Sequence, residues 1–395
     1  MEKKEDDGME GYSDRIRIAT TEDGFRRLAE EVKETAHGGK VLLFAKEDRA
    51  GKEAATALTT AGVPVIKQSL EEGGVSIDLL LSKEYPESIL AVVGVGGAAE
   101  MQAAKSVRIG RVLPRILFPT DLSALNALDE RSFFSTKGDV LTFTTEGHAV
   151  LLDKKMLTSG VREGVGWVLA RLIEIADGGY QGLIEEGKSP TDALTLFREG
   201  CALLQGVREE DAAERLMQTA LLLQDRIREK ALTLSDSAHI LSFLIEKRVG
   251  GSAVSYLFAA AYSLLCLYAR YLGDLPLEHA VPPDPVKNEE KLRDLSGIGS
   301  LTFSEMPLYA DLYAERFRLT AEYREDFSEC FSDSFLPLSA LCRVYRRKGG
   351  GKEGVAPSAN ELLALLSLTG ELVSGYPLIK HIKMSGILEP LLACC

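Results

Sequence analysis

Ile89-Leu90-Ala91-Val92-Val93-Gly94-Val95-Gly96-Gly97-Ala98 is the stretch that decides the fold. Its first five residues form a continuous apolar run, which is typical of a strand buried on both faces of a parallel sheet. The residues from Ala98 to Val107 follow a helical pattern, so the glycines lie at a tight turn from strand to helix. Backbone N–H groups at such a turn can hold a phosphate, with the helix dipole behind them. A turn that only requires a positive φ explains the glycines about equally well.

Short apolar runs alternate with helical patterns on both sides of this stretch. Further strands are expected at Val41–Ala45, Val63–Ile66 and Arg115–Phe118, with a helix at Ala54–Ala61. Two more runs, Val140–Phe143 and Ala149–Leu152, are separated by Glu146-Gly147 and predict a hairpin. The alternation as a whole predicts βαβ units and a largely parallel sheet.

From about Met156 onward the pattern is helical. Ser189-Pro190-Thr191-Asp192 has the composition of a helix start, and Leu216 to Ala231 repeats apolar residues at helical spacing. Further helices are expected at Ser304–Phe327 and Asn360–Val373, with loops at 281–285 and 347–354. We therefore predict a disordered acidic tail over residues 1–11, an α/β nucleotide-binding-like domain over 12–157 and an all-helical domain over 158–395.

Composition excludes some classes of partner. The 395 residues carry a formal net charge of −13, which argues against nucleic acid or an anionic membrane as the main partner. Six cysteines without metal-type spacing indicate free thiols in a reducing compartment, and only the terminal pair Cys394-Cys395 is unusual. The charged start of the chain has no apolar core of a signal peptide, so a cytoplasmic location is expected.

One uncharged run, Gly250 to Ala269, is long enough to span a bilayer. Its content of Gly, Ser, Ala and Tyr, and the amphipathic helices around it, favour a buried helix at the centre of the helical half. We expect the hydroxyls of Tyr256 and Tyr262 to find partners there.

The order of motifs resembles a known family. The glycine loop is followed by a helix ending in Ala104-Lys105, then by Phe118-Pro119-Thr120-Asp121-Leu122-Ser123, then by Val150-Leu151-Leu152-Asp153, and then by the helical half. This order and spacing, over roughly residues 12–280, resembles the glycerol-1-phosphate dehydrogenase branch of the family that includes glycerol dehydrogenase, iron-containing alcohol dehydrogenases and dehydroquinate synthase. The resemblance implies a dehydroquinate synthase-like two-domain fold with a cleft between the domains.

The resemblance also implies a set of cofactor-binding residues. They are Gly94, Gly96, Gly97, Lys105, Thr120 and Ser123. The chain departs from the family pattern at Ala98 and Gln102, where the family has a third glycine and an aspartate. It departs again at Ala124 and Leu125, where this branch has His-Asp. The aspartate of that pair would contact a polyol substrate, which Leu125 cannot do.

The metal ligands implied by the resemblance are replaced. The family's metal-binding aspartate follows a Gly-x-Gly, and here Trp167 follows Gly164-Val165-Gly166. Val254 stands where the first metal-binding histidine is expected, and Tyr271 is near the second. Tryptophan and valine offer no lone pair to a cation, so no metal is expected. Of the five histidines, His279 beside Glu278 is the best remaining candidate, and His37, His148, His239 and His381 are expected to be surface or core residues.

Two hypotheses follow. In the first, the protein is a divergent NAD- or NADP-dependent polyol-phosphate oxidoreductase with an altered site. In the second, which we favour, it is a non-catalytic relative that binds at most a nucleotide or a small phosphorylated ligand in the interdomain cleft. The end of the first strand carries Lys46, Glu47 and Asp48. A carboxylate there would favour the ribose hydroxyls of NAD and a lysine the 2′-phosphate of NADP, so these residues do not distinguish the two cofactors. No catalytic residue is identified; a homo-oligomer is expected, without nucleic acid or membrane.

Overall fold

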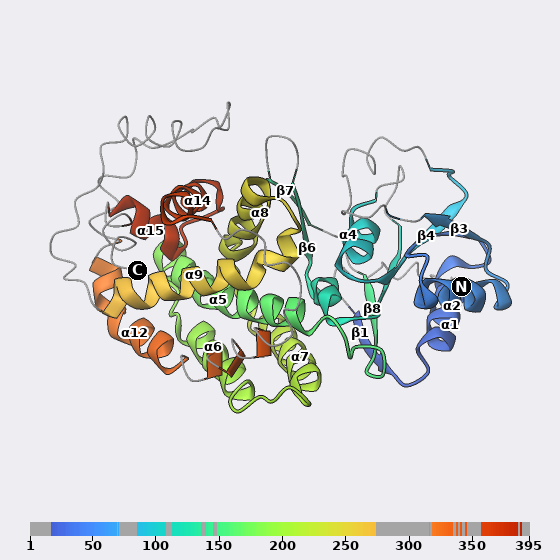
Figure 1. The fold of residues 1–395 in the computed structure, drawn as a ribbon, viewed down its shortest axis with the longest axis horizontal. Coiled ribbons are helices and arrows are strands. Elements are labelled where there is room, and N and C mark those ends of the chain that lie inside the picture. Colours follow the sequence, from blue (N-terminus) through green and yellow to red (C-terminus); the bar gives the residue numbers. More distant parts are fainter. Residues whose placement is uncertain are drawn as a thin grey trace, which may run out of the picture. The chain divides into compact units, whose positions relative to one another are not determined.

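The computed structural model describes residues 17–68, 70, 85–107, 113–135, 140–144, 148–273, 316, 318–334, 337–338, 340–341, 344–345, 357–385 and 388. The chain divides into two compact units, one within Met1–Thr136 and Leu141–Gly160, the other within Lys137–Val140 and Val161–Cys395. The first is α/β and the second is helical, so the expected fold class is confirmed (Figure 1). The predicted tail over residues 1–11, the predicted loops at 281–285 and 347–354, and Cys394-Cys395 lie outside the described residues.

A six-stranded parallel sheet forms the centre of the first unit, in the order β1-β8-β5-β4-β2-β3. The strands are β1 Arg17–Thr21, β2 Lys40–Ala45, β3 Val65–Gln68, β4 Ile89–Gly96, β5 Arg115–Pro119 and β8 Ala149–Asp153. The first-unit helices are α1 Gly24–Ala36, α2 Arg49–Thr60, α4 Ala98–Ser106 and the short 3₁₀ helix η1 Leu122–Leu128.

Helices cover both faces of this sheet. Side chains of α1 and α2, such as Leu28, Val32 and Leu58, form one core with alternate strand residues such as Val93 and Ile116. The helix α4 lies on the opposite face, where a Cβ on Gly94 would be 2.9 Å from the Cβ of Ala104. Burial on both faces explains why the strands read as continuous apolar runs.

The predicted hairpin between 140–143 and 149–152 is wrong. β7 Val140–Thr144 pairs with β6 Arg131–Ser135 in a separate two-stranded sheet, and β8 joins the main sheet between β1 and β5. All five residues of β8 are buried. A strand whose residues are all apolar fits the interior of a parallel sheet, where both faces are covered. It does not fit one arm of an exposed hairpin, where polar residues would alternate with apolar ones.

The helical unit is built around α5 Val161–Glu186 and α9 Ala253–Gly273, which pack against each other (Figure 1). Close approach is possible because Gly166 has no side chain: a Cβ there would be 3.0 Å from the backbone N of Phe258. The other described helices are α6 Thr191–Leu203, α7 Ala212–Lys230, α8 Ser237–Val249, α12 Arg324–Asp333, α14 Ala359–Leu372 and α15 Leu378–Met384.

The uncharged run forms α9, which begins at Ala253 because Gly250 and Gly251 have φ values of 80° and 98°. Among the described residues one helix, α9, is long enough and apolar enough to cross a membrane. Half of its most apolar segment is buried inside the structure. It packs against α5, α8 and α12, as a core helix does. The Tyr256 hydroxyl donates to the Gly250 carbonyl (2.7 Å), as expected, whereas the Tyr262 side chain is exposed and stacks on Phe258.

Candidate functional site

The glycine loop lies at the carboxyl end of β4 and opens α4. Gly96 has a φ of +141°, a conformation that favours glycine, and Gly97 is the N-cap of α4. The backbone N–H of Thr120, after β5, donates to the Gly96 carbonyl (3.0 Å). The backbone N–H of Ala98 donates to the Ser123 hydroxyl (3.2 Å). The loop after β4 and the loop after β5 are therefore held together at one edge of the sheet.

This edge includes the topological switch point of the sheet. The connection from β2 leads outward to β3, and the connection from β4 leads in the opposite direction to β5, while β2 and β4 are neighbours. In open α/β sheets, ligands bind outside the carboxyl ends of the strands at such a point. Gly96 and Gly97 end one of these two strands and Lys46 follows the other.

A carboxylate occupies the start of α4. Oε2 of Glu100 accepts a hydrogen bond from the backbone N–H of Gly97 (2.9 Å), which is one of the amides that would otherwise face a phosphate. The Glu100 side chain is 1% exposed. Burial raises the pKa of Glu100, the charge of Lys46 opposes that rise, and the charge of Asp121 adds to it. The sequence analysis did not predict a role for Glu100 at this loop. An acid three residues after a helix N-cap is a known capping signal, which could have identified it.

The structure brings four of the six expected cofactor-binding residues together: Gly96, Gly97, Thr120 and Ser123. Gly94 instead lies under α4, where its lack of a side chain allows the helix to approach the sheet. Lys105 is near the other end of α4, and its amine donates to the carbonyls of Asn126, Asp129 and Arg131 (2.7, 3.2 and 3.0 Å). Contact of any of the six with a ligand stays a prediction.

The residues after β2 have separate roles. Asp48 caps α2, since its Oδ1 accepts from the backbone N–H of Gly51 (2.9 Å). Glu47 forms an ion pair with Lys67 (3.0 Å). Lys46 is exposed, and its charge acts on Glu100. At this edge of the sheet, Lys46 is thus an exposed cation whose charge acts on Glu100 of the glycine loop. Both carboxylates, Glu47 and Asp48, have local partners.

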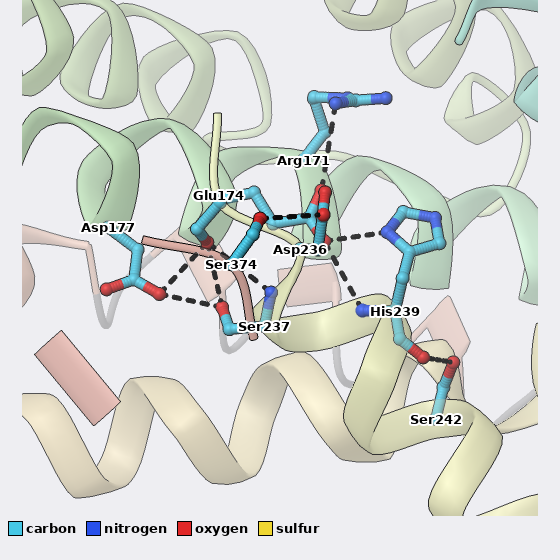
Figure 2. A network of polar contacts seen from close by, with 9 residues as sticks. Arg171, Glu174, Asp177, Asp236, Ser237, His239, Ser242 and Ser374 are labelled. Atoms are coloured by element: carbon cyan, nitrogen blue, oxygen red, sulfur yellow. Dashed lines mark hydrogen bonds and ion pairs between the residues drawn. The ribbon is translucent and has the colours of Figure 1, made fainter. Parts of the chain in front are cut away.

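A buried polar network lies in the helical unit (Figure 2). Oε1 of Glu174, on α5, accepts from the backbone N–H of His239 (3.3 Å) and lies 2.6 Å from its Nδ1. Arg171 Nη1 is 3.7 Å from Glu174 Oε2, and the Ser374 hydroxyl donates to Asp236 (3.4 Å). Burial alone would raise the pKa of Glu174, but His239 and Arg171 outweigh burial and hold that pKa below its ordinary value.

Asp177, one turn further along α5, joins four elements. Its carboxylate accepts from the hydroxyls of Ser235, Ser237 and Tyr268 (3.0, 2.7 and 3.0 Å) and from the backbone N–H of Leu378 (2.6 Å). Burial raises the pKa of Asp177 to about 6, against the lowering effect of these donors. The group ties α5 to the segment before α8, to α8 itself, to α9 and to α15.

The described residues do not fit the divalent metal that the resemblance implies. The Trp167 side chain is 2% exposed, and the guanidinium of Arg171 lies 5.3 Å from its ring. Leu125 is buried in η1, and Tyr271 is buried in α9. Within the described part of the chain, no group of three or more His, Cys, Asp or Glu side chains has the arrangement of a metal site. An indole and a guanidinium offer no lone pair to a cation.

The histidines that the structure describes have ordinary surroundings. His37 ends α1 in the left-handed conformation, and Nε2 of the buried His148 lies 2.7 Å from the Ala127 carbonyl. His239 is a core residue paired with Glu174, as expected. His381 is packed among Tyr180, Tyr271 and Tyr376, and burial lowers its pKa to about 3. His279 lies outside the described residues.

Comparison with known proteins gives the class of the fold. No protein-family model and no curated protein matches the sequence. Solved structures do match along nearly the whole chain. An iron-containing alcohol dehydrogenase from Corynebacterium glutamicum is 15% identical with a TM-score of 0.58, covering 96% of this chain and 94% of that one. An iron-containing alcohol dehydrogenase from Thermotoga maritima is 15% identical with a TM-score of 0.56, covering 96% and 98%.

An archaeal alcohol dehydrogenase from a Red Sea brine pool is 12% identical with a TM-score of 0.57, covering 96% of each chain. The protein therefore has the two-domain, dehydroquinate synthase-like fold of the iron-containing alcohol dehydrogenases, and the expected resemblance is confirmed at the level of the fold. At these identities the likeness concerns the fold, and activity must be argued from the residues.

Proposed function

We propose that this protein is a non-catalytic relative of the NAD(P)-dependent polyol-phosphate dehydrogenases that binds a nucleotide or a small phosphorylated ligand at the glycine loop of its α/β unit. The observation that carries the binding role is the joint placement of Gly96, Gly97, Thr120 and Ser123 at the carboxyl edge of the sheet, beside its switch point. The expected position of the ligand between the two domains stays a prediction.

The proposed loss of catalysis rests on Trp167 and Arg171 in the helical unit and on Leu125 in the α/β unit. Metal-dependent alcohol oxidation needs an open cation site that polarises the reacting oxygen. A buried indole at Trp167 stands where the resemblance places the first metal ligand, and the buried guanidinium of Arg171 lies beside it, 5.3 Å from the ring. Leu125 adds an apolar side chain where the related branch has a substrate-binding acid.

The alternative is an active NAD(P)-dependent oxidoreductase with an altered site. It is favoured by the three solved structures compared above, which are alcohol dehydrogenases. Under this alternative the purified protein would turn over a polyol phosphate with a nicotinamide, at a rate that no added divalent ion changes.

The decisive experiment is a titration with NADH and NADPH, followed by nicotinamide fluorescence, on wild type and Gly97→Ala. Gly97 has a φ of −91°, so alanine fits the backbone, but its Cβ would be 3.0 Å from the Ser123 hydroxyl and 3.3 Å from Asp121. We expect binding by wild type and at least tenfold weaker binding by Gly97→Ala. Gly182→Ala is the control, because its Cβ would be 3.9 Å from its nearest neighbour, in the helical unit.

Equal affinity of wild type and Gly97→Ala would remove the loop from the proposal. Oxidation of glycerol phosphate with either nicotinamide would favour the alternative. We also propose that the protein is a cytoplasmic homo-oligomer without nucleic-acid or membrane partners. The net charge of −13 supports the absence of nucleic acid, and the packing of α9 against other helices supports the absence of a membrane partner. Light scattering of the purified protein and cell fractionation test these points.

A further inference from the structure

The residues that follow β2 place a cation and a carboxylate on opposite sides of the strand. β2 lies between β4 and β3 in the sheet. The carboxylate of Glu47 forms its ion pair with Lys67 of β3 (3.0 Å), on the side away from the glycine loop. The charge of Lys46 instead acts on Glu100, in the helix that follows β4. The acid is therefore directed to one neighbouring strand and the cation to the other.

The strand register brings Lys46 next to the glycine loop. Ala45 is paired with Val95, so the residues that come next, Lys46 and Gly96, lie at the same level of the sheet. Neighbouring strands are about 4.8 Å apart. The helix α2 fixes the backbone of Lys46 there, because a Cβ on Gly51 would collide with the Lys46 carbonyl oxygen.

The amine of Lys46 can engage a ligand without giving up another contact. The side chain is exposed, and among the residues that the structure describes no hydrogen bond or ion pair holds it. The charged side chains that follow it along the chain are occupied: Asp48 caps α2 through the Gly51 N–H (2.9 Å), and Arg49 pairs with Glu53 (2.7 Å). Lys46 is thus positioned to meet an anion beside the glycine loop.

The chemistry of a dinucleotide gives this position a meaning. When the pyrophosphate is held at a glycine loop, the adenosine ribose reaches the end of the adjacent strand. An acid at that place hydrogen-bonds the free ribose hydroxyls, whereas a cation accommodates a 2′-phosphate. Lysine has three donors and no acceptor, so it suits the phosphate. A cation beside the loop, with the acid directed to β3, fits a phosphorylated ribose.

We propose that Lys46 makes the nucleotide site selective for a 2′-phosphate on the adenosine ribose, so that NADPH binds in preference to NADH. The inference rests on the proposed nucleotide binding at the glycine loop and names the ligand class that this site selects. NADPH and NADH differ only in the 2′-phosphate. Their ratio of affinities therefore reports on Lys46, whereas the affinity that they share reports on the loop.

The test is a calorimetric titration of full-length protein with NADPH and with NADH. We expect wild type to bind NADPH about tenfold more tightly, as one charge-assisted contact allows. Lys46→Ala should bring the two dissociation constants together by weakening NADPH, and Lys46→Arg should keep the preference. The contact is exposed, so the wild-type preference should also decrease as salt is added. This last measurement needs no variant.

Lys33→Ala is the matched control. Lys33 is exposed in the last turn of α1, which leads to the start of β2 and hence to the opposite edge of the sheet. The substitution removes the same charge far from the proposed contact and should leave the preference for NADPH unchanged. Glu47→Gln should also leave it unchanged, because Glu47 is paired with β3.

The possible failures are distinguishable. Equal affinity of wild type for NADPH and NADH would overturn the inference and leave the proposed function in place. Equal weakening of both nicotinamides by Lys46→Ala would also overturn it, because the lysine would then act on the shared pyrophosphate. Weaker NADH binding by Glu47→Gln would assign the ribose to the acid and overturn it as well. Absence of binding by either nicotinamide would contradict the proposed function, and the inference with it.

Discussion

At the scale of the residue, Glu100 competes with any anion at the glycine loop. Its carboxylate accepts from the Gly97 N–H and faces the charge of Asp121, so a phosphate must displace one negative charge and approach another. We predict that Glu100→Gln strengthens NADH or NADPH binding about fivefold, which corresponds to on the order of 1 kcal/mol for a charge at a helix N-terminus. Fluorescence titration at low ionic strength measures the change.

Glu30→Gln is the control for this substitution, because Glu30 is exposed on α1 of the same unit. It removes the same charge from the chain without touching the loop. Weaker nucleotide binding by Glu100→Gln would show that Glu100 helps to form the site, and unchanged binding would show that its carboxylate does not compete with the ligand.

Asp177 gives the helical unit a pH dependence. Its pKa is raised from 3.8 to about 6, so the folded state favours the protonated form. The stabilisation is complete below about pH 4, decreases as the pH rises, and is lost above about pH 6. The difference corresponds to roughly 3 kcal/mol of unfolding free energy. Urea unfolding followed by Trp167 fluorescence at several pH values measures this slope.

Asp177→Asn should flatten the slope between pH 4 and 6, because asparagine does not titrate there. Asp225→Asn, at an exposed position on α7, should keep it. A slope that persists in Asp177→Asn would assign the pH dependence to other groups.

The glycine-loop motif could be found from sequence because all of its signals are local: an apolar strand, two glycines and a helical pattern. Glu100 carries a local capping signal, since its carboxylate bonds the N–H of Gly97 three residues earlier. Its interaction with the charge of Asp121 could not be predicted, because it depends on the approach of two loops that are about 20 residues apart in the chain. The network around Arg171 and Glu174 was missed for the same reason, since its partners on α8 and near Ser374 come together only in the folded unit.

At the scale of the element, two glycines of α5 have opposite roles. A Cβ on Gly178 would lie 2.7 Å from the carbonyl carbon of Thr233 and 2.9 Å from the Cα of Leu234, so the segment before α8 packs directly on the α5 backbone. We predict that Gly178→Ala lowers the unfolding free energy by about 2–4 kcal/mol, because the rigid backbone there must move.

Gly182→Ala, one turn later, is the matched substitution. Its Cβ would make an ordinary contact at 3.9 Å. Alanine should therefore stabilise the helix by roughly 0.5–1 kcal/mol through its higher helix propensity. Denaturation of both variants in urea gives the comparison, and a similar loss in both would mean that α5 does not tolerate any side chain on this face.

The elements themselves were predictable where burial and periodicity agree. β4, α4, β5 and α7 lie within a few residues of their expected bounds. The hairpin failed because a buried strand carries no information about which neighbour it pairs with. β8 was assigned to β7, its neighbour in sequence, whereas its partners β1 and β5 lie further away along the chain.

At the scale of the whole molecule, each unit has its own core, so we predict two unfolding transitions in urea. Trp167 is the only tryptophan and lies on α5, so its fluorescence follows the helical unit. Asp177→Asn should shift the fluorescence midpoint at pH 7 and leave the second transition, seen by circular dichroism, in place. One coincident transition by both probes, shifted as a whole by Asp177→Asn, would contradict this.

The pairing of β1 with β8 has a consequence for synthesis of the chain. The first described strand is completed by the last strand of its unit, and the N–H of Gly24 is bound by the carboxylate of Asp153, 129 residues away in sequence. At about 5–20 residues per second, the ribosome needs roughly 6–26 s to supply that partner. For this interval the amino-terminal strand of the nascent chain has no native neighbour. It is therefore the segment that a chaperone would have to shield.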